Sequence, residues 1–192
     1  MKKFALILGF AYIVAFSLAA RAQQPAPDGP RFVNGTNLVK PADYREWIFL
    51  SSGLGMTYQP PGTAPAPPTF GNVFVNPSSY RSFMQTGKWP NGTTFVLEFR
   101  NSDSEASINK SGRFQTTLAN VEAEVKDSRF PDGWAYYAFM GSGTSASPLT
   151  GDTVARCIDC HTKNTAVERT FVQFYPTLLE VARQKGTLKP GF

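Results

Sequence analysis

The segment FGNVFVNPSSYRSFMQTGKWPNGTTFVLEFR, residues 70–100, decides the fold of this 192-residue chain. It begins with Phe70–Val75, whose β-branched and aromatic side chains favour a strand. Asn76-Pro77 supplies a helix N-cap and a proline at the first helical position, and Gly87 is a typical helix end. A tight Trp-Pro-Asn-Gly turn then leads into residues 93–100, where apolar and polar side chains alternate. The segment predicts a strand, a short helix and a second strand.

More strands are predicted on both sides of this segment. Residues 113–126 predict a long strand, with some ambiguity towards helix near residues 121–124, and residues 134–140 are the clearest strand of the chain. The polar residues 101–112 predict a hairpin loop before the long strand. An earlier element is expected at residues 44–50 and should end at the Ser-Ser-Gly that follows it.

The pattern changes towards the C-terminus. Residues 141–152 are rich in Gly, Ser and Thr and predict a flexible loop. A helical pattern follows His161, and its last helix is opened by Pro176 and closed by Gly186. Strands followed by helices indicate an α+β domain, mainly an antiparallel β-sheet with short helices and a C-terminal helical segment.

The first 22 residues have the parts of a secretory signal peptide: a charged start, an apolar run and a small-x-small end at Ala20-Arg21-Ala22. An uncleaved membrane anchor is the alternative, but the apolar run is short for a spanning helix. We therefore expect export to the periplasm and no membrane attachment after cleavage. Residues 23–38 are expected to form a flexible tail, and residues 39–192 the folded domain.

The charge of the mature chain gives no sign of a nucleic-acid partner. The full chain has 19 Lys and Arg against 14 Asp and Glu, a net charge of +5. Removing the three basic residues of the leader leaves 16 against 14, a net charge of +2. No cluster of Lys and Arg remains that could follow a phosphate backbone.

The only histidine of the chain follows two cysteines in the motif Cys157-Ile158-Asp159-Cys160-His161. Cys-x-x-Cys-His is the attachment sequence of c-type haem. The two thiols can each add to one vinyl group of the porphyrin, and the adjacent imidazole can bind the iron. The motif therefore predicts one covalent haem c, with Cys157, Cys160 and His161 as cofactor-binding residues and His161 as the metal ligand.

Other uses of two cysteines are a disulfide, a thioredoxin-like redox pair or a zinc site. A thioredoxin-like pair is disfavoured because a Gly/Ser loop, not a βαβ pattern, precedes the motif. A zinc site would need an acid as its fourth ligand. The position of the single histidine directly after the second cysteine would also be a rare coincidence, so haem attachment is the favoured interpretation.

The second axial position of the iron decides what such a haem does. A bis-histidine haem is excluded because the chain has no second imidazole, and a methionine ligand would have to be Met56, Met84 or Met140. Methionines fill apolar cores more often than they bind iron. We therefore expect a five-coordinate iron in an apolar pocket, which binds small diatomic ligands.

The chain resembles the cytochrome P-460 family, which also contains cytochrome c′-beta. The resemblance runs through almost the whole expected domain and rests on landmarks in one order: Pro41-x-x-Tyr44-Arg45-Glu46-Trp47, the segments at residues 72–80, 86–93, 122–128 and 133–136, the haem motif, and Phe174-Tyr175-Pro176. It implies a largely antiparallel β fold, a homodimer, and one five-coordinate c-type haem in the periplasm.

Two positions depart from the family members that oxidise hydroxylamine. Those members have a lysine cross-linked to the porphyrin where this chain has Leu97, and a pocket arginine where it has Gly71. Glu122 matches the carboxylate that they carry near the distal pocket, although it could equally be a surface acid. The resemblance thus makes Glu122 a tentative catalytic residue.

Strand alternation puts Phe95, Leu97 and Phe99 on one side of their strand. Phe95 and Leu97 are predicted to contact the haem as a dry distal wall, and ordinary sheet core is the alternative for all three side chains. An apolar wall of this kind resembles cytochrome c′-beta, which binds nitric oxide and carbon monoxide.

The sequence therefore predicts an exported mono-haem cytochrome that binds nitric oxide or carbon monoxide, or that transfers electrons to a redox partner protein. The alternative is a hydroxylamine or nitric-oxide oxidoreductase of the cytochrome P-460 type, with Glu122 as general base. A soluble electron-transfer protein is a third possibility if one of the methionines binds the iron.

Overall fold

The computed structural model describes residues 27–192 apart from residues 59, 61, 64 and 65. The predicted signal peptide at residues 1–22 and the first residues of the expected tail lie outside the described residues. Within the described part of the chain, no helix has the length and apolar character needed to cross a membrane.

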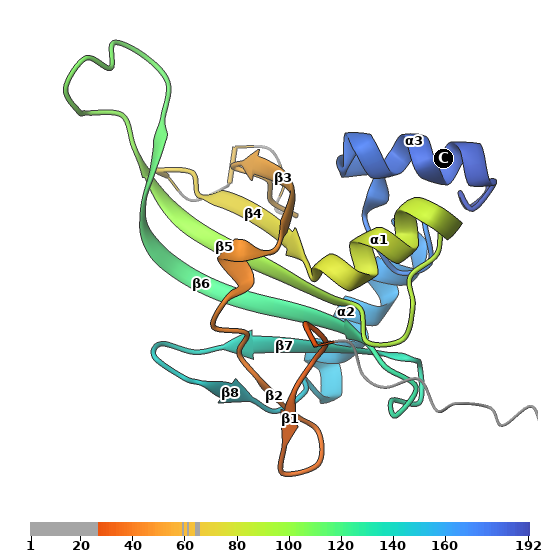
Figure 1. Ribbon diagram of the computed structural model, residues 1–192. Coiled ribbons are helices and arrows are strands. Elements are labelled where there is room, and N and C mark those ends of the chain that lie inside the picture. The colour runs from red at the N-terminus through yellow and green to blue at the C-terminus, as the bar shows by residue number, and fades with distance from the viewer. Residues whose placement is uncertain (1–26, 59, 61, 64–65) are drawn as a thin grey trace, which may run out of the picture.

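Two antiparallel sheets form the frame of the fold (Figure 1). The larger has five strands in chain order: β3 Ile48–Leu54, β4 Phe70–Val75, β5 Thr94–Asp103, β6 Phe114–Lys126 and β7 Trp134–Phe139. The smaller has three short strands in the order β1 Phe32–Val33, β2 Asn37–Val39 and β8 Ser145–Ala146.

Among the described residues, three α-helices and two 3-10 helices accompany the sheets: α1 Pro77–Thr86, α2 Gly151–Lys163, α3 Pro176–Lys185, η1 Tyr44–Glu46 and η2 Val172–Phe174. The α+β prediction is therefore confirmed. The predicted ends of α1 and α3 are also found, because Gly87 and Gly186 adopt the left-handed conformation that stops each helix.

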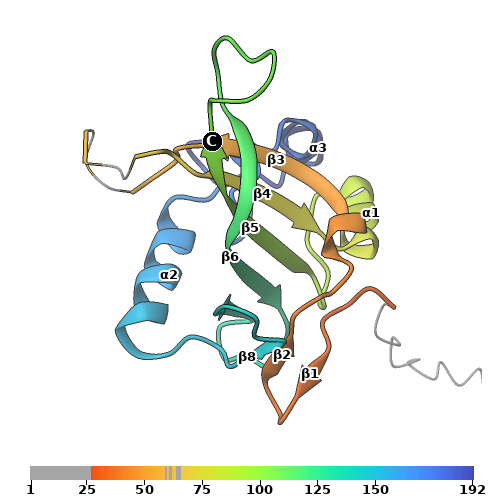
Figure 2. The ribbon, with the colours of Figure 1, turned by 90° about the vertical axis from the view of Figure 1, so that its left-hand side faces the viewer.

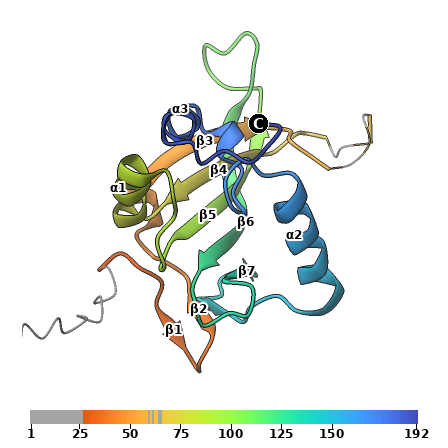
Figure 3. The ribbon, with the colours of Figure 1, turned by 90° about the vertical axis from the view of Figure 1, so that its right-hand side faces the viewer.

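The two faces of the five-stranded sheet are covered by different elements. On the η1 face, Val96, Ala123 and Tyr137 are buried against η1 and the small sheet. On the helix face, Val75 and Phe95 are buried against α1, α3 and the segment after α2. Figure 3 looks onto the helix face: α1 and α3 stand on one side, α2 on the other, and β5 and β6 are visible between them.

The register of the central strands decides which side chains share the helix face. Leu97 pairs with Val73 on one side and with Glu122 on the other, and Glu122 pairs with Ala138. Directly paired residues of antiparallel strands point to the same face, so these four form one row across the sheet. The next row towards α1 contains Val75, Phe95, Glu124 and Tyr136.

The N-terminal segment differs from the expected flexible tail. Its residues 32–38 contribute to β1 and β2, and Leu38 is completely buried in the core. Asp28 accepts hydrogen bonds from the backbone N–H of Ser78 (2.7 Å) and from its hydroxyl (2.5 Å), at the first turn of α1. Asp28 thus satisfies a helix N-terminus that lies fifty positions later in the chain.

Asn76 occupies the predicted N-cap position, but its side chain makes no capping bond to α1. Its Oδ1 instead accepts a 2.9 Å hydrogen bond from the backbone N–H of Thr94 at the start of β5. The side chain therefore ties the helix start to the next strand, and the capping role passes to Asp28.

Two further predictions were wrong in their boundaries. The element expected at residues 44–50 is η1 followed by β3, and β3 continues through Ser51–Gly53 because those residues pair with β4. The flexible loop expected at residues 141–152 contains β8, and α2 already begins at Gly151.

Candidate functional site

The Cys-x-x-Cys-His motif lies in the second half of α2, not at the end of a loop. Cys157 and Cys160 are one helical turn apart, and both are free, half-buried thiols. Burial and the negative charge of Glu122 raise the pKa of the Cys157 thiol. The helix therefore presents two free thiols and the imidazole of His161 together.

No residue of α2 is buried, although the helix is amphipathic. Its apolar positions Val154, Cys157, Ile158 and His161 all stay partly exposed. An amphipathic helix in a folded domain normally buries its apolar stripe against a core. The exposed stripe of α2 is therefore chemically suited to cover an apolar group placed between it and the sheet.

His161 is held in a fixed orientation over β6 and β7. Its Nδ1 lies 2.8 Å from the backbone carbonyl oxygen of Arg169, and its ring meets the edges of Tyr136 and Phe171 at 4.8 Å between ring centroids. With Nδ1 engaged, Nε2 makes no hydrogen bond to the described residues. This is the arrangement of a metal-binding imidazole, in which one nitrogen donates to a carbonyl and the other is left for the metal.

A carboxylate also faces the same nitrogen. Glu124 Oε1 lies 3.2 Å from His161 Nδ1, and the side chains are 12% and 19% exposed. Burial lowers the pKa of His161, but the adjacent Glu124 and the Arg169 carbonyl together outweigh this effect, so the pKa is raised. Buried atoms without a hydrogen-bond partner in the described structure gather here: Glu124 Oε1, Tyr136 Oη and Arg169 Nη1.

The part of the helix face near the two thiols is apolar and incompletely covered. Leu97, Phe99 and Ala138 are partly buried there. A Cβ atom at Gly71 would lie 3.5 Å from Leu97 Cδ1 and 3.7 Å from Phe99 Cε1, so these two side chains lie beside the glycine. Leu97 and Gly71, the two departures from the hydroxylamine-oxidising pattern, are therefore neighbours on this surface.

Phe95 occupies a different environment from Leu97. It is 5% exposed and packs edge-to-face on Trp89 at 4.8 Å and parallel to Tyr175 at 6.4 Å. The structure thus brings Leu97 and Glu122 together near the thiols and places Phe95 in the apolar core of the next row. The predicted haem contact of Phe95 stays a prediction.

Glu122 is the acidic group next to Leu97. Its Oε1 accepts a 3.1 Å hydrogen bond from Asn120 Nδ2, and burial raises the pKa of its carboxyl group. Its charge also acts on Cys157. The side chain can therefore accept or release a proton close to the thiols, and it is not an isolated surface acid.

Tyr58, in the connection between β3 and β4, was missed by the sequence analysis. Tyr58 is 90% exposed, and its phenol lies close enough to Cys160, Glu122 and Cys157 for their charges to act on it. Figure 2 shows this connection and α2 extending on the same side of the sheet.

The three candidate methionine ligands lie in different places. Met84 is on α1, and Met140 at the end of β7 is 79% exposed. Met56 is 62% exposed and folds back against Gly53, on the helix face of β3. Only Met56 therefore lies on the loop that also carries Tyr58.

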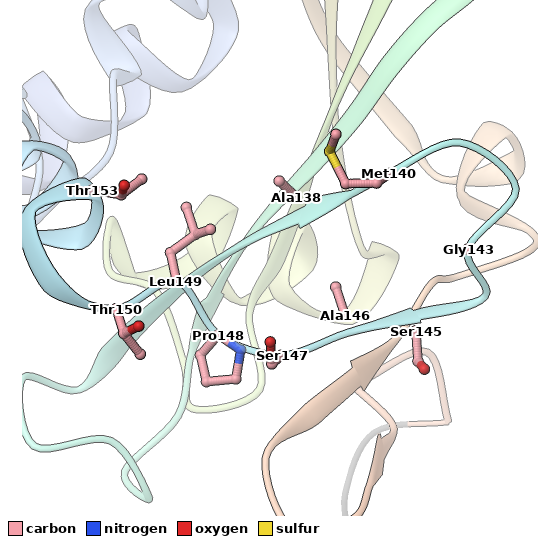
Figure 4. Close-up of a pocket in the computed structure, with 10 residues that line it drawn as sticks. All are labelled: Ala138, Met140, Gly143, Ser145, Ala146, Ser147, Pro148, Leu149, Thr150 and Thr153. Carbon is pink, nitrogen blue, oxygen red and sulfur yellow. The ribbon is translucent and has the colours of Figure 1, made fainter.

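A hollow of about 580 Å³ opens beside the N-terminal end of α2 (Figure 4). Its lining comes from Thr153 of α2 and from residues 138–150, which connect β7 to the helix. Ala138 lines this hollow and also belongs to the row of Leu97 and Glu122. The hollow thus adjoins the surface that faces the thiols.

These residues fit a covalently held haem. Two free thiols and an oriented imidazole lie on a helix with an exposed apolar stripe, and an apolar part of the sheet lies opposite. Of the surrounding residues, Glu124 could have been inferred because it shares the strand face of Glu122. Arg169, Tyr136 and Phe171 carry no sequence signal, since only tertiary contacts bring them to His161.

Comparison with known proteins agrees with this geometry. Residues 41–172 match the family described as Cytochrome P460. A search of the curated proteins gave no match. The family match covers more than half of the chain and includes Cys157, Cys160 and His161. The protein therefore belongs to the cytochrome P460 family, which implies a haem cofactor.

Proposed function

We propose that this protein is an exported mono-haem c-type cytochrome that binds a small diatomic gas such as nitric oxide or carbon monoxide at its iron. The observation that carries the proposal is the geometry of His161. Its Nδ1 is engaged by the carbonyl of Arg169, 2.8 Å away, so its Nε2 is the nitrogen available to an iron.

The two cysteines supply the covalent attachment. Each thiol would add across one vinyl group of a porphyrin, with its sulfur bonding to one vinyl carbon and its proton going to the other. Because Cys157 and Cys160 lie one helical turn apart, they can reach two vinyl groups of the same porphyrin.

The surroundings favour neutral ligands over anions. When bound, the haem supplies an iron that changes oxidation state and coordinates small ligands. Leu97 and Phe99 offer no hydrogen-bond donor, and the Glu122 carboxyl adds negative charge when ionised. An anion would lose its hydration there without gaining a partner, whereas nitric oxide or carbon monoxide loses little.

The decisive experiment uses the mature protein made in cells that mature c-type cytochromes. We expect a coloured protein whose mass exceeds that of the polypeptide by one haem, with a high-spin oxidised spectrum and carbon monoxide uptake after reduction. Replacing Cys157 and Cys160 together by Ser should remove the covalent haem. Asp159→Asn is the matched control: it lies between the cysteines, is exposed, and pairs with Lys163. A colourless wild-type protein of bare polypeptide mass would overturn the proposal.

Electron transfer is tested by the same spectra. If a methionine occupies the sixth coordination position, the iron is low-spin and does not bind carbon monoxide. Met56→Leu is then the first variant to make, because Met56 lies on the helix face beside Gly53. Met84→Leu and Met140→Leu are its controls.

Oxidation of hydroxylamine or nitric oxide is a second candidate function, favoured by Glu122. Its raised pKa and its position near Cys157 suit a general base for a substrate bound near the haem. Leu97 cannot provide the nitrogen of a lysine cross-link. A turnover assay with hydroxylamine and an electron acceptor decides: activity that Glu122→Gln abolishes supports the enzyme, and inactivity with intact haem removes it.

Export and dimerisation complete the proposal. The predicted leader lies outside the described residues, so N-terminal sequencing of the periplasmic protein should find Gln23 first. The homodimer rests on the family resemblance, and sedimentation of the purified protein should give twice the monomer mass.

A further inference from the structure

Three polar side chains surround the imidazole of His161 and have no role in the proposed function. They belong to Glu124 on β6, Tyr136 on β7 and Arg169 in the segment after α2, which we call the proximal cluster. Glu124 and Tyr136 are direct neighbours in the β6–β7 register. All three contribute a buried polar atom that lacks a hydrogen-bond partner in the described structure.

Two acceptors compete for the single Nδ1 proton of His161. The Arg169 carbonyl oxygen lies at 2.8 Å and Glu124 Oε1 at 3.2 Å. A proton on Nδ1 can be shared between them in a three-centre hydrogen bond. Because Glu124 projects from the middle of a thirteen-residue strand, its distance from the imidazole is fixed by the sheet.

Burial raises the pKa of Glu124, whereas His161 and Arg169, the charged groups that face it, act in the opposite direction. Arg169 is the nearest cation in the cluster and acts on the Glu124 carboxyl group. Lys126, the next residue on the same strand face, is paired with Glu168 at 2.5 Å. Asp132 approaches the outer side of Arg169 at 3.8 Å. The electrostatic effect of the Glu124 carboxylate is largest on His161, which it contacts, because little water screens their interaction.

We propose that Glu124 is a positioning residue for the axial imidazole, which accepts the Nδ1 proton together with the Arg169 carbonyl and makes His161 a stronger electron donor to iron. This inference rests on the proposed function. A carboxylate hydrogen-bonded to a metal-binding histidine raises the basicity of the ligand and fixes its ring. The expected consequence is that Glu124 stabilises the oxidised iron relative to the reduced iron.

The test replaces Glu124 by Gln, which keeps the size and the acceptor oxygen but removes the charge. At a fixed applied potential near the wild-type midpoint, the ratio of oxidised to reduced protein should fall about tenfold, which is a rise of about 59 mV for one electron. The iron–histidine stretching band of the reduced protein in resonance Raman spectra should also move to lower frequency, because the ligand donates less.

Asp132→Asn is the matched control. It removes one negative charge next to Arg169 without touching the imidazole, and Asp132 is half exposed. We expect a ratio within about twofold of wild type and an unchanged iron–histidine band, since exposed charges are screened. A shift in this control as large as that of Glu124→Gln would reduce the effect to general electrostatics and overturn the proposal.

Two outcomes distinguish this inference from the proposed function. If wild-type protein contains no haem, the proposed function fails. If Glu124→Gln retains its haem with wild-type ratio and band, the positioning role of Glu124 fails alone. Should Glu124→Gln not fold, Glu124→Asp keeps the charge and shortens the reach. A lowered iron–histidine band in that variant supports the proposal, and an unchanged band overturns it.

Discussion

The two faces of the central sheet differ in how many hydrogen-bond donors surround their acidic residues. On the η1 face, Glu98 is 3% exposed and accepts hydrogen bonds from four side chains: Tyr44 at 2.5 Å, Arg100 at 2.6 Å, Arg45 at 2.9 Å and Asn72 at 3.2 Å. On the helix face, Glu122 has only Asn120 as a hydrogen-bond donor among the described residues, and Glu124 Oε1 faces the Nδ1 of His161 at 3.2 Å, a nitrogen that it shares with the Arg169 carbonyl.

The pKa values follow this difference. Burial alone would raise the pKa of Glu98, but its hydrogen bonds and the two arginines lower it to about 2. Burial raises the pKa of Glu122 and of Glu124, whose partners are too few to reverse it. Carboxyl groups with raised pKa values are common at functional sites, whereas fully paired ones serve the fold. The η1 face thus pairs its buried acid fully, whereas the helix face, on which we propose that the haem lies, leaves its acids with few partners.

The largest expected effect comes from breaking the network of Glu98. Glu98→Gln leaves Arg100 and Arg45 facing a neutral amide in a mostly buried site, and such a loss costs about 3 to 5 kcal/mol. Chemical denaturation of wild type and variant measures the change. The haem spectrum of the folded variant should stay that of wild type, since Glu98 lies on the other face. A variant as stable as wild type would show that the network contributes nothing to stability.

The pH dependence of stability tests the same contrast with a slightly smaller effect. The pKa of Glu98 falls from 4.5 to about 2 on folding, so its contribution is complete above pH 4.5 and is lost as the pH drops towards 2. This shift corresponds to stabilisation on the order of 3 kcal/mol. Unfolding curves recorded between pH 6 and pH 2 should therefore fall less steeply for Glu98→Gln than for wild type, and parallel curves would contradict this assignment.

Substitutions at two neighbouring residues of β5, Val96 and Leu97, compare the two faces of the sheet directly. Val96 is completely buried on the η1 face, so Val96→Ala should cost about 2 kcal/mol through lost burial and a cavity. Leu97→Ala should cost about 1 kcal/mol or less, because Leu97 is partly exposed, yet it should change carbon monoxide binding to the reduced protein. Thermal unfolding and flash photolysis measure the two effects. Equal ligand kinetics in both variants would place Leu97 outside the ligand pocket.

The smallest expected effect belongs to Glu122→Gln. The folded-state pKa of Glu122 is raised, so its ionisation opposes folding as the pH rises above 4.5. At neutral pH the variant should therefore be as stable as wild type or more stable by less than about 1 kcal/mol. Denaturation at pH 5 and pH 8 checks the sign. A clear loss of stability would mean that Glu122 has a structural partner comparable to those of Glu98.

The strand pattern of the sequence predicted much of this contrast. Alternation along residues 93–100 correctly separated Leu97 from Val96, since the side-chain period of a strand is two. The same alternation could not tell that Phe95 is buried under Tyr175 while Leu97 stays partly exposed. That difference depends on where α3 packs, and the sequence of a strand does not indicate where a helix will pack on it.

The N-terminal segment shows the converse limit. Its polar composition predicted a flexible tail, yet Asp28 binds the first turn of α1 and Leu38 is buried in the core. Local composition indicates how much apolar surface a segment can bury by itself. It does not indicate the contacts that a distant helix and a second sheet provide.

The sequence by itself determined which groups are candidates to hold a haem, because the thiols and the imidazole of Cys157, Cys160 and His161 come from five consecutive residues. It also determined the alternation of the sheet and the ends of two helices, which are local properties of the backbone. Only the tertiary structure decided the surroundings of His161. Arg169, Glu124 and Tyr136 come from three separate segments, and their distances from the imidazole depend on strand register and on the packing of α2.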